Sequence, residues 1–204
     1  MTIHAMQVGP IGTNCYLLID EEASLCAVID PGDDAARIAA KIGELGVTLC
    51  YILITHGHYD HTTAATELSL RYPDAELYIH AAELCVDGKS PRYFYPAPEN
   101  VKTYAEGDTL TLGSLTIRVM ETPGHSAGSV TLQVGDVLFC GDTLFAGSCG
   151  RTDLPGGDMQ TILRSLRRLG ALEGDYHVLP GHMEPSTLSR ERASNPYLRE
   201  AMNS

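Results

Sequence analysis

The sequence predicts an α/β fold in which two mixed β-sheets pack together and helices flank them. Short apolar runs typical of strands occur near both ends of the chain, and helical periodicity appears between them. The last twenty or so residues again have helical character. A chain of 204 residues suits one domain with a sizeable core, so we expect residues 1–204 to form a single domain.

The first hundred residues predict strands interleaved with two helices. Runs rich in Val, Ile and Leu, separated by turn residues, predict strands over residues 3–8, 15–20, 25–29, 50–55 and 77–80. Apolar residues recur at helical spacing over 35–45, and Gly46 ends this helix. A second helix is expected over 62–71, where Pro73 stops it, and the proline-rich segment 86–100 is expected to be a loop.

The second half of the chain is predicted to be mostly β-structure. Its apolar runs predict strands over residues 110–112, 115–120, 130–134, 137–140 and 176–179. Helical spacing predicts a third helix over 159–169, before the helical C-terminal segment. Periodicity does not fix the order of strands within a sheet, so these patterns leave the topology open.

The composition favours a small-molecule partner. The net charge is −12, whereas proteins that bind duplex nucleic acid or anionic membranes usually carry a basic face. No basic N-terminal region and no run of about 18 apolar residues is present, so we expect a cytoplasmic protein without a membrane span. The six cysteines form no C-x-x-C pair, so nothing indicates a thiolate zinc site. The oligomeric state stays open.

The strongest functional signal is the segment His56-Gly57-His58-Tyr59-Asp60-His61, directly after a predicted strand. Histidines at positions i and i+2 can converge on one ion from a tight turn, and Asp60 and His61 then point to a second position. Neutral imidazole and carboxylate are the usual ligands of zinc and related divalent metals. The segment therefore predicts a metal centre.

Three later segments place a further histidine or aspartate after a predicted strand and a glycine. These are His125 after Gly124, Asp142 after Gly141, and His182 after Gly181. Glycine permits sharp turns and close backbone approach, and side chains at strand ends are held rigidly. Four such groups in one chain indicate a shared metal site. The other histidines fit no such pattern, and we predict surface or structural roles for His4, His80 and His177.

Together these segments resemble the metallo-β-lactamase superfamily, in particular its small glyoxalase-II-like (hydroxyacylglutathione hydrolase-like) members. The resemblance extends over almost the whole chain, through Thr13-Asn14-Cys15-Tyr16, Asp30-Pro31-Gly32, Gly150-Arg151-Thr152-Asp153 and Asn195-Pro196-Tyr197. It implies an αββα sandwich with the metals at one edge. It also implies a first metal held by His56, His58 and His125, a second held by Asp60, His61 and His182, and Asp142 bridging both.

The chemistry that the resemblance implies is hydrolysis of small acyl thioesters or esters, such as S-lactoylglutathione. The cofactors would be two divalent metal ions, zinc first, with iron or manganese as alternatives. A metal-bridging hydroxide would act as nucleophile, with Asp60 and Asp142 as the catalytic side chains. The two ions outweigh two carboxylates and a hydroxide in charge, which suits a developing oxyanion.

Two other activities stay open. A persulfide dioxygenase, a sister group that this sequence resembles at residues 149–153, would use one iron in a site of two histidines and one carboxylate, here His56, His125 and Asp142. A nucleic-acid phosphodiesterase is disfavoured by the acidic balance. The chain ends about twenty residues after His182, so we expect the C-terminal helical, glutathione-binding domain of full-length glyoxalase II to be absent.

Without that domain, loops of the main domain are expected to bind the substrate. The candidates are the aromatic and basic segment with Lys89, Arg92, Tyr93 and Tyr95, and also Arg151. For Arg151 two interpretations remain, namely orientation of Asp142 or of the substrate, and a surface ion pair with Asp153.

One further pattern has to be set aside. Residues 124–128 match the G-x-S-x-G nucleophile elbow, but that turn requires a helix directly after the serine. Here β-like residues follow, so Ser126 is predicted to be a turn residue.

Overall fold

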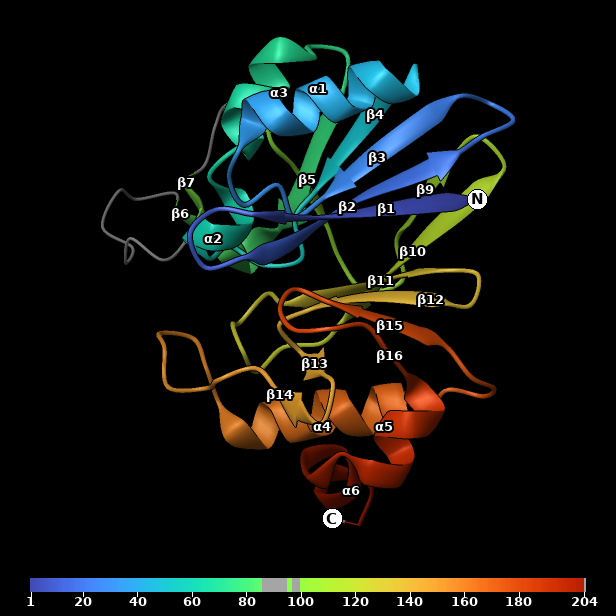
Figure 1. The fold of residues 1–204 in the computed structure, drawn as a ribbon. Helices are drawn as coiled ribbons and strands as arrows, with labels where there is room; N and C mark the ends of the chain where they lie inside the picture. The colour runs from blue at the N-terminus through green and yellow to red at the C-terminus, as the bar shows by residue number, and fades with distance from the viewer. Residues whose placement is uncertain (86–94, 97–99, 204) are drawn as a thin grey trace.

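The structure, a computed structural model, describes residues 1–85, 95–96 and 100–203. Two six-stranded mixed sheets lie between two groups of helices, which confirms the predicted αββα order (Figure 1). The first sheet contains, in spatial order, β1 (Thr2–Val8), β2 (Thr13–Asp20), β3 (Leu25–Ile29), β4 (Thr48–Leu53), β5 (Glu76–His80) and β8 (Lys102–Tyr104). The second contains β16 (Ser186–Thr187), β15 (His177–Pro180), β12 (Val137–Gly141), β11 (Val130–Val134), β10 (Leu115–Glu121) and β9 (Thr109–Leu112).

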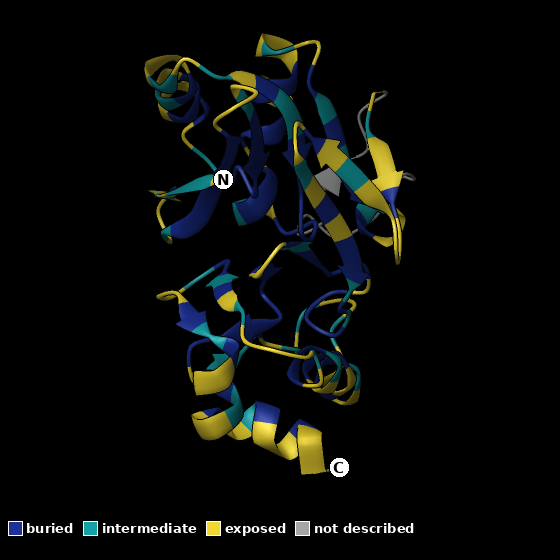
Figure 2. Ribbon diagram, turned by 90° about the vertical axis from the view of Figure 1, so that its right-hand side faces the viewer, coloured by how far each residue is buried: buried dark blue, intermediate teal, exposed yellow. Residues whose placement is uncertain are grey.

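The central strands are apolar at consecutive positions because both faces of each sheet are covered. Leu17 packs in the core under the first helix layer, whereas its neighbour Leu18 packs between the two sheets. In the same way, Val28 packs under the first helix layer and Ile29 packs between the two sheets. A strand that is buried on both faces needs no polar alternation. Figure 2 shows these buried strands between helices with exposed outer surfaces.

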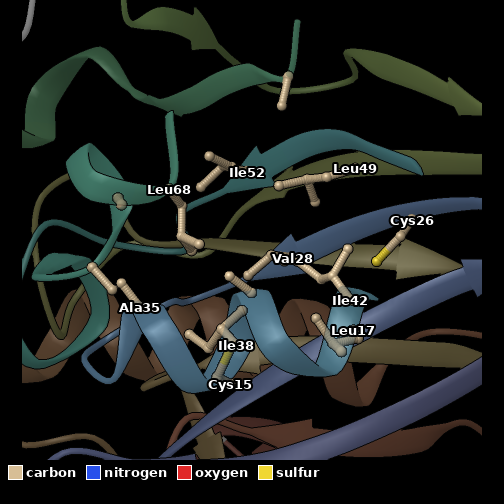
Figure 3. Packing of buried hydrophobic residues seen from close by; sticks show 14 of the residues in the cluster. Cys15, Leu17, Cys26, Val28, Ala35, Ile38, Ile42, Leu49, Ile52 and Leu68 are labelled. Carbon is tan, nitrogen blue, oxygen red and sulfur yellow. The ribbon is translucent and has the colours of Figure 1, made fainter. Parts of the chain in front are cut away.

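The outer helix layers complete the sandwich. The helices α1 (Ala35–Leu45) and α3 (Ala65–Arg71) cover the first sheet, and Figure 3 shows Ile38 and Ile42 of α1 directed towards the strands. The second sheet is covered by α4 (Met159–Gly170), α5 (Leu188–Ser194) and α6 (Pro196–Asn203). The α4 helix begins at Asp158, whose side chain accepts a hydrogen bond from the Thr161 N–H. Among the described helices, none is long and apolar enough to cross a membrane.

The second predicted helix differs from the structure. The helix predicted over 62–71 begins only at Ala65, as α3, and a separate short helix, α2 (Tyr59–Thr62), precedes it. The Ala64 N–H donates to the Pro31 carbonyl at 3.0 Å, so it leaves the helical ladder. Because of this break, Asp60 and His61 lie on α2, a helix separate from α3.

Several short strands were not expected from the sequence. Of β8, only Tyr104 is buried, so the apolar pattern is weak, although this strand extends the first sheet beside β5. Two-residue strands form the pairs β13 (Leu144–Phe145) with β14 (Ser148–Cys149) and β6 (Leu84–Cys85) with β7 (Tyr95–Pro96). Such short pairs depend on their tertiary surroundings and have no period to detect.

Candidate metal centre

All seven predicted metal-binding side chains meet at one edge of the sandwich. They come from the loop after β4, from α2, from the β10–β11 connection and from the ends of β12 and β15. Figure 1 shows α2 at this edge, beside the turn that joins β1 and β2. The residues that the fold brings together are His56, His58, Asp60, His61, His125, Asp142 and His182.

A first group consists of three buried histidines. One ring nitrogen of each of His56, His58 and His125 lies within 4.8 Å of the others. His58 Nδ1 and His125 Nε2 face each other at 2.9 Å. Three imidazole nitrogens directed at one point are an arrangement that suits a divalent metal.

A second group lies next to the first. One ligand atom each of Asp60, His61 and His182 also falls within 4.8 Å. Asp60 Oδ2 is 3.3 Å from His61 Nε2 and 3.0 Å from His182 Nε2. The group is therefore as compact as the three histidines, and it includes a carboxylate.

Asp142 lies between the two groups. Its Oδ2 is 3.5 Å from His125 Nε2 and 3.6 Å from His182 Nε2. Its Oδ1 is 3.5 Å from His61 Nε2. This one carboxylate thus contacts members of both groups, as a bridging ligand must.

Hydrogen bonds at the outer nitrogens orient three of the imidazoles. His125 Nδ1 bonds to the Arg151 carbonyl at 2.7 Å, and since a carbonyl can only accept, this nitrogen donates. His61 Nδ1 lies 3.0 Å from Asp30 Oδ2, and His56 Nδ1 lies 3.1 Å from the Thr55 hydroxyl. Each partner fixes the ring and leaves its Nε2 lone pair for the centre.

Asp30 is not one of the seven candidate ligands, but its carboxylate holds the outer nitrogen of His61. Its carboxylate also accepts the Thr55 N–H and the Thr55 hydroxyl, both at 2.7 Å. Asp30 directly follows β3 and lies in the left-handed region, at φ 52°, at the point where the chain leaves the sheet. Asp30 was not among the predicted ligands, although an acidic residue straight after an apolar strand follows the same pattern as the ligands.

Glycines allow the backbone to approach the centre closely. A Cβ atom at Gly181 would lie 2.4 Å from Asp142 Oδ1 and 2.5 Å from His61 Cε1. A Cβ at Gly150 would lie 1.8 Å from the Asp142 carbonyl oxygen. No larger residue fits at these two positions without moving the metal-binding side chains.

Burial sets the charge states of these groups. Burial and the neighbouring histidines lower the pKa of His56 well below its ordinary value, and they lower the pKa of His58 to about 4. Burial disfavours ionisation of Asp60, but its close contacts with the rings of His182 and His61 outweigh burial and hold the pKa of this carboxyl below its usual range. Two neutral imidazoles and a carboxylate are the forms that bind metals.

The behaviour of His61 indicates where positive charge is favoured. Burial alone would lower its pKa, but the carboxylates of Asp142 and Asp30 outweigh burial and raise the pKa well above the ordinary value. The position at His61 Nε2 is thus one that attracts a cation.

A divalent metal fits this donor set. Among the described residues, the buried atoms His56 Nε2, His61 Nε2 and Asp142 Oδ1 make no hydrogen bond. Such atoms cost free energy unless a partner is supplied. All three point into the same cluster, and a cation would satisfy each of them.

A cavity of about 630 Å³ opens over the centre, within the usual size of small-molecule sites. Arg151 lines it, and the neighbouring Gly150 lies close to the Asp142 main chain. Orientation of Asp142 or of the substrate by the Arg151 side chain stays a prediction. The guanidinium also bonds to Asp153 at 2.7 and 2.6 Å, as the other interpretation predicted.

Two other sequence predictions concern the aromatic and basic segment and the G-x-S-x-G match. Lys89, Arg92, Tyr93 and the Tyr95 side chain lie outside the described residues. A strand, β11, follows residues 124–128, so the nucleophile elbow is absent there and Ser126 lies in a turn, as expected.

The histidine outside the centre with clear partners is His80. Its Nδ1 accepts the Ala82 N–H, and its Nε2 lies 3.1 Å from Glu121 Oε1. These contacts agree with the predicted structural role.

Comparison with known proteins gives the same assignment. The family model described as "Metallo-beta-lactamase superfamily" matches residues 8–182. The hydroxyacylglutathione hydrolase GloC of Haemophilus influenzae is 31% identical over 97% of this chain and 98% of its own. The BLEG-1 B3 metallo-beta-lactamase structure has a TM-score of 0.84 at 33% identity and covers 97% of this chain and 99% of its own. The ETHE1 structure from Myxococcus xanthus also has a TM-score of 0.84, at 28% identity, and covers 100% of this chain and 91% of its own. By sequence, fold and the side chains at the strand ends, this chain belongs to the metallo-β-lactamase superfamily.

Proposed function

We propose that this protein is a binuclear metal-dependent hydrolase of small acyl thioesters, with S-lactoylglutathione as a reference substrate. The observation that carries the proposal is the position of Asp142 between two complete groups of ligands. The superfamily binds divalent metals, and the similarity to GloC supports the thioester.

In this proposal the first metal is held by His56, His58 and His125, the second by Asp60, His61 and His182, with Asp142 shared. Zinc is the first candidate, and iron or manganese the next. When bound, two such ions would lower the pKa of a coordinated water molecule and would polarise the substrate carbonyl.

The side chains of the protein then position the reaction. Asp60 stays ionised and accepts a hydrogen bond from Thr13 Oγ1 at 3.1 Å, so it can orient a proton of the attacking water. Asp142 keeps the two groups of ligands at a fixed separation. The main-chain carbonyl of Arg151 accepts the hydrogen bond from His125 Nδ1 and so orients the ring. The Arg151 guanidinium is not needed for this role.

The test is metal analysis of protein purified without added metal, paired with an assay of thioester hydrolysis and an assay of persulfide-dependent oxygen uptake. We expect two divalent ions per chain, with hydrolysis of S-lactoylglutathione that a chelator abolishes and added zinc restores. Metal-replete protein that hydrolyses no thioester would refute the proposal.

A persulfide dioxygenase is the second candidate, favoured by the likeness to the ETHE1 structure. It would use one iron at His56, His125 and Asp142. A single bound iron together with persulfide-dependent oxygen uptake would replace the first proposal with this one. Retention of Asp60, His61 and His182 in one compact group favours two metals.

Arg151→Ala is expected to raise KM for S-lactoylglutathione about threefold and to leave kcat unchanged. The guanidinium lines the cavity and can contact an anionic thiol half, whereas the carbonyl that holds His125 is untouched. Steady-state kinetics with Asp153→Ala as the companion variant check this. A fall in kcat at constant KM would instead assign the side chain to orienting Asp142.

Glu83→Gln is expected to weaken metal binding at the first group by about tenfold. The buried Glu83 carboxylate accepts the N–H of Gly57 at 2.7 Å and the N–H of Gly128 at 2.5 Å, so it ties the loop with His56 and His58 to the loop with His125. An amide offers only one acceptor for these two donors.

The control for Glu83 is Glu191→Gln. Glu191 is also fully buried and accepts the Gly147 N–H and the Asn195 amide, but it contacts none of the seven ligands in these bonds. This variant should lower the melting temperature without changing metal affinity. Equal metal titrations for both variants would contradict a positioning role for Glu83.

A further inference from the structure

Three large apolar side chains are exposed at the mouth of the metal-centre cavity. Ile11 is 53% exposed, Tyr59 is 49% exposed and Met183 is 48% exposed, and all three line the cavity. Among the described residues, the other large exposed apolar side chains lie at the N-terminus and on α3, α4 and α6. Single exposed apolar residues are common, but three around one opening mark a binding surface.

The backbone holds these three side chains in place. Ile11 lies in the turn between β1 and β2, and the Asn14 side chain ties β2 to the Met183 carbonyl at 2.9 Å. Tyr59 begins α2, directly before Asp60. The apolar surface is therefore fixed next to Asp60 and His182, both members of the second ligand group.

A smaller hollow of about 220 Å³ continues this surface. It shares Ile11, Tyr59 and Asp60 with the main cavity and is also lined by Val8 and Pro10. Phe145 extends the apolar lining on the main side, where its ring meets the His182 ring edge-on, with the centroids 6.3 Å apart.

The polar side of the cavity lining lies near His125, a member of the first ligand group. Ser148 and Arg151 line this side of the cavity together with Cys149 and Leu154, and the Arg151 carbonyl accepts a hydrogen bond from His125. Among the described residues that line it, Arg151 is the one Lys or Arg side chain. A thioester has an acyl half and a thiol half, and the two kinds of lining match one apolar half and one polar half.

We propose that the acyl half of the substrate is an unbranched apolar chain that lies against Ile11, Tyr59 and Met183 and reaches towards the smaller hollow. The thiol half, which carries the polar groups in most biological thioesters, lies towards Ser148 and Arg151. This inference rests on the proposed thioesterase function and specifies its substrate class as thioesters of unbranched apolar acyl groups. S-lactoylglutathione, whose short acyl group carries a hydroxyl, serves only as a reference substrate for the reaction type.

The experiment uses metal-replete protein and thioesters of one thiol, N-acetylcysteamine, with acetyl, butyryl and hexanoyl groups. We expect kcat/KM to rise about fourfold per added methylene, the ratio that corresponds to about 0.8 kcal/mol per buried methylene. In Ile11→Ser and Met183→Gln this dependence should become shallower, with the acetyl thioester least affected. Leu70→Ser, at a residue that is 78% exposed on α3, should keep the wild-type dependence.

Binding of the unreactive S-butyl and S-hexyl thioethers of N-acetylcysteamine, measured by calorimetry, separates the two proposals. Hydrolysis of every thioester with no dependence on chain length, in wild type and variants alike, overturns the apolar acyl site and leaves the thioesterase. If no thioester is hydrolysed but hexyl binds more tightly than butyl in wild type and not in Ile11→Ser, the thioesterase fails and the apolar site stands. An equal loss of hexyl binding in Leu70→Ser would overturn the site.

Discussion

Asp142→Ala is expected to lower kcat/KM for thioester hydrolysis by about 10³-fold or more and to reduce the metal content. Asp142 is the carboxylate that contacts both ligand groups, with Oδ1 at His61 and Oδ2 at His125 and His182. In the proposed mechanism its removal would affect the nucleophile and the polarisation of the carbonyl together, a loss of about 4 kcal/mol in transition-state stabilisation. Kinetics and elemental analysis on the same sample measure both effects.

The control for Asp142 is Asp136→Ala. Asp136 lies in the turn just before β12, the strand that ends at Asp142, and its side chain is exposed. This variant should keep wild-type metal content and turnover. Two metals per chain and near-normal turnover in Asp142→Ala would show that Asp142 is not the shared ligand.

Asp30→Ala is expected to destabilise the fold by about 3 kcal/mol and to lower metal affinity at the second ligand group. The variant would leave the buried Thr55 N–H and hydroxyl and His61 Nδ1 without their acceptor. His61 would then be free to rotate or to change tautomer. Thermal unfolding with and without added zinc, together with a metal titration, checks the result.

Two variants sharpen the test of Asp30. Asp30→Asn keeps one acceptor oxygen and tolerates the positive φ, so its effect should be intermediate. Asp20→Ala removes another buried aspartate at a strand end, one that accepts from Ser114 and Ala23. It should lower the melting temperature and leave the metal titration unchanged. The same metal affinity in Asp30→Ala as in wild type would rule out the support of His61.

The seven candidate ligands gave a signal in the sequence because the segments that carry them follow strands. The segment from His56 to His61 follows β4, and three further ligands each follow a strand and a glycine, namely His125, Asp142 and His182. Ligand chemistry also admits few residue types. Asp30 has the same placement, but its role depends on the distance to His61, which lies 31 positions later in the chain. Glu83 gave no signal at all, since its two donors are main-chain N–H groups on loops that only folding brings together.

The apolar surface at the cavity was beyond prediction for a similar reason. In the sequence, Ile11, Tyr59 and Met183 are ordinary apolar residues. Nothing in the sequence distinguishes an apolar residue at the surface from one in the core at these positions. We assign them to a binding surface because all three side chains are exposed and line the same cavity. Both observations depend on how the chain packs.

The α/β class, most strands and helices, and a site for divalent metals could be predicted from the sequence alone, because hydrophobic period and ligand identity are local properties. Tertiary structure alone decided the strand order in each sheet, the division of the segment 59–71 into α2 and α3, and the contacts of Asp142 with both ligand groups. The physical reason is that neighbouring residues such as Leu17 and Leu18 can each be buried on either face, and only the packing of both sheets with both helix layers fixes which.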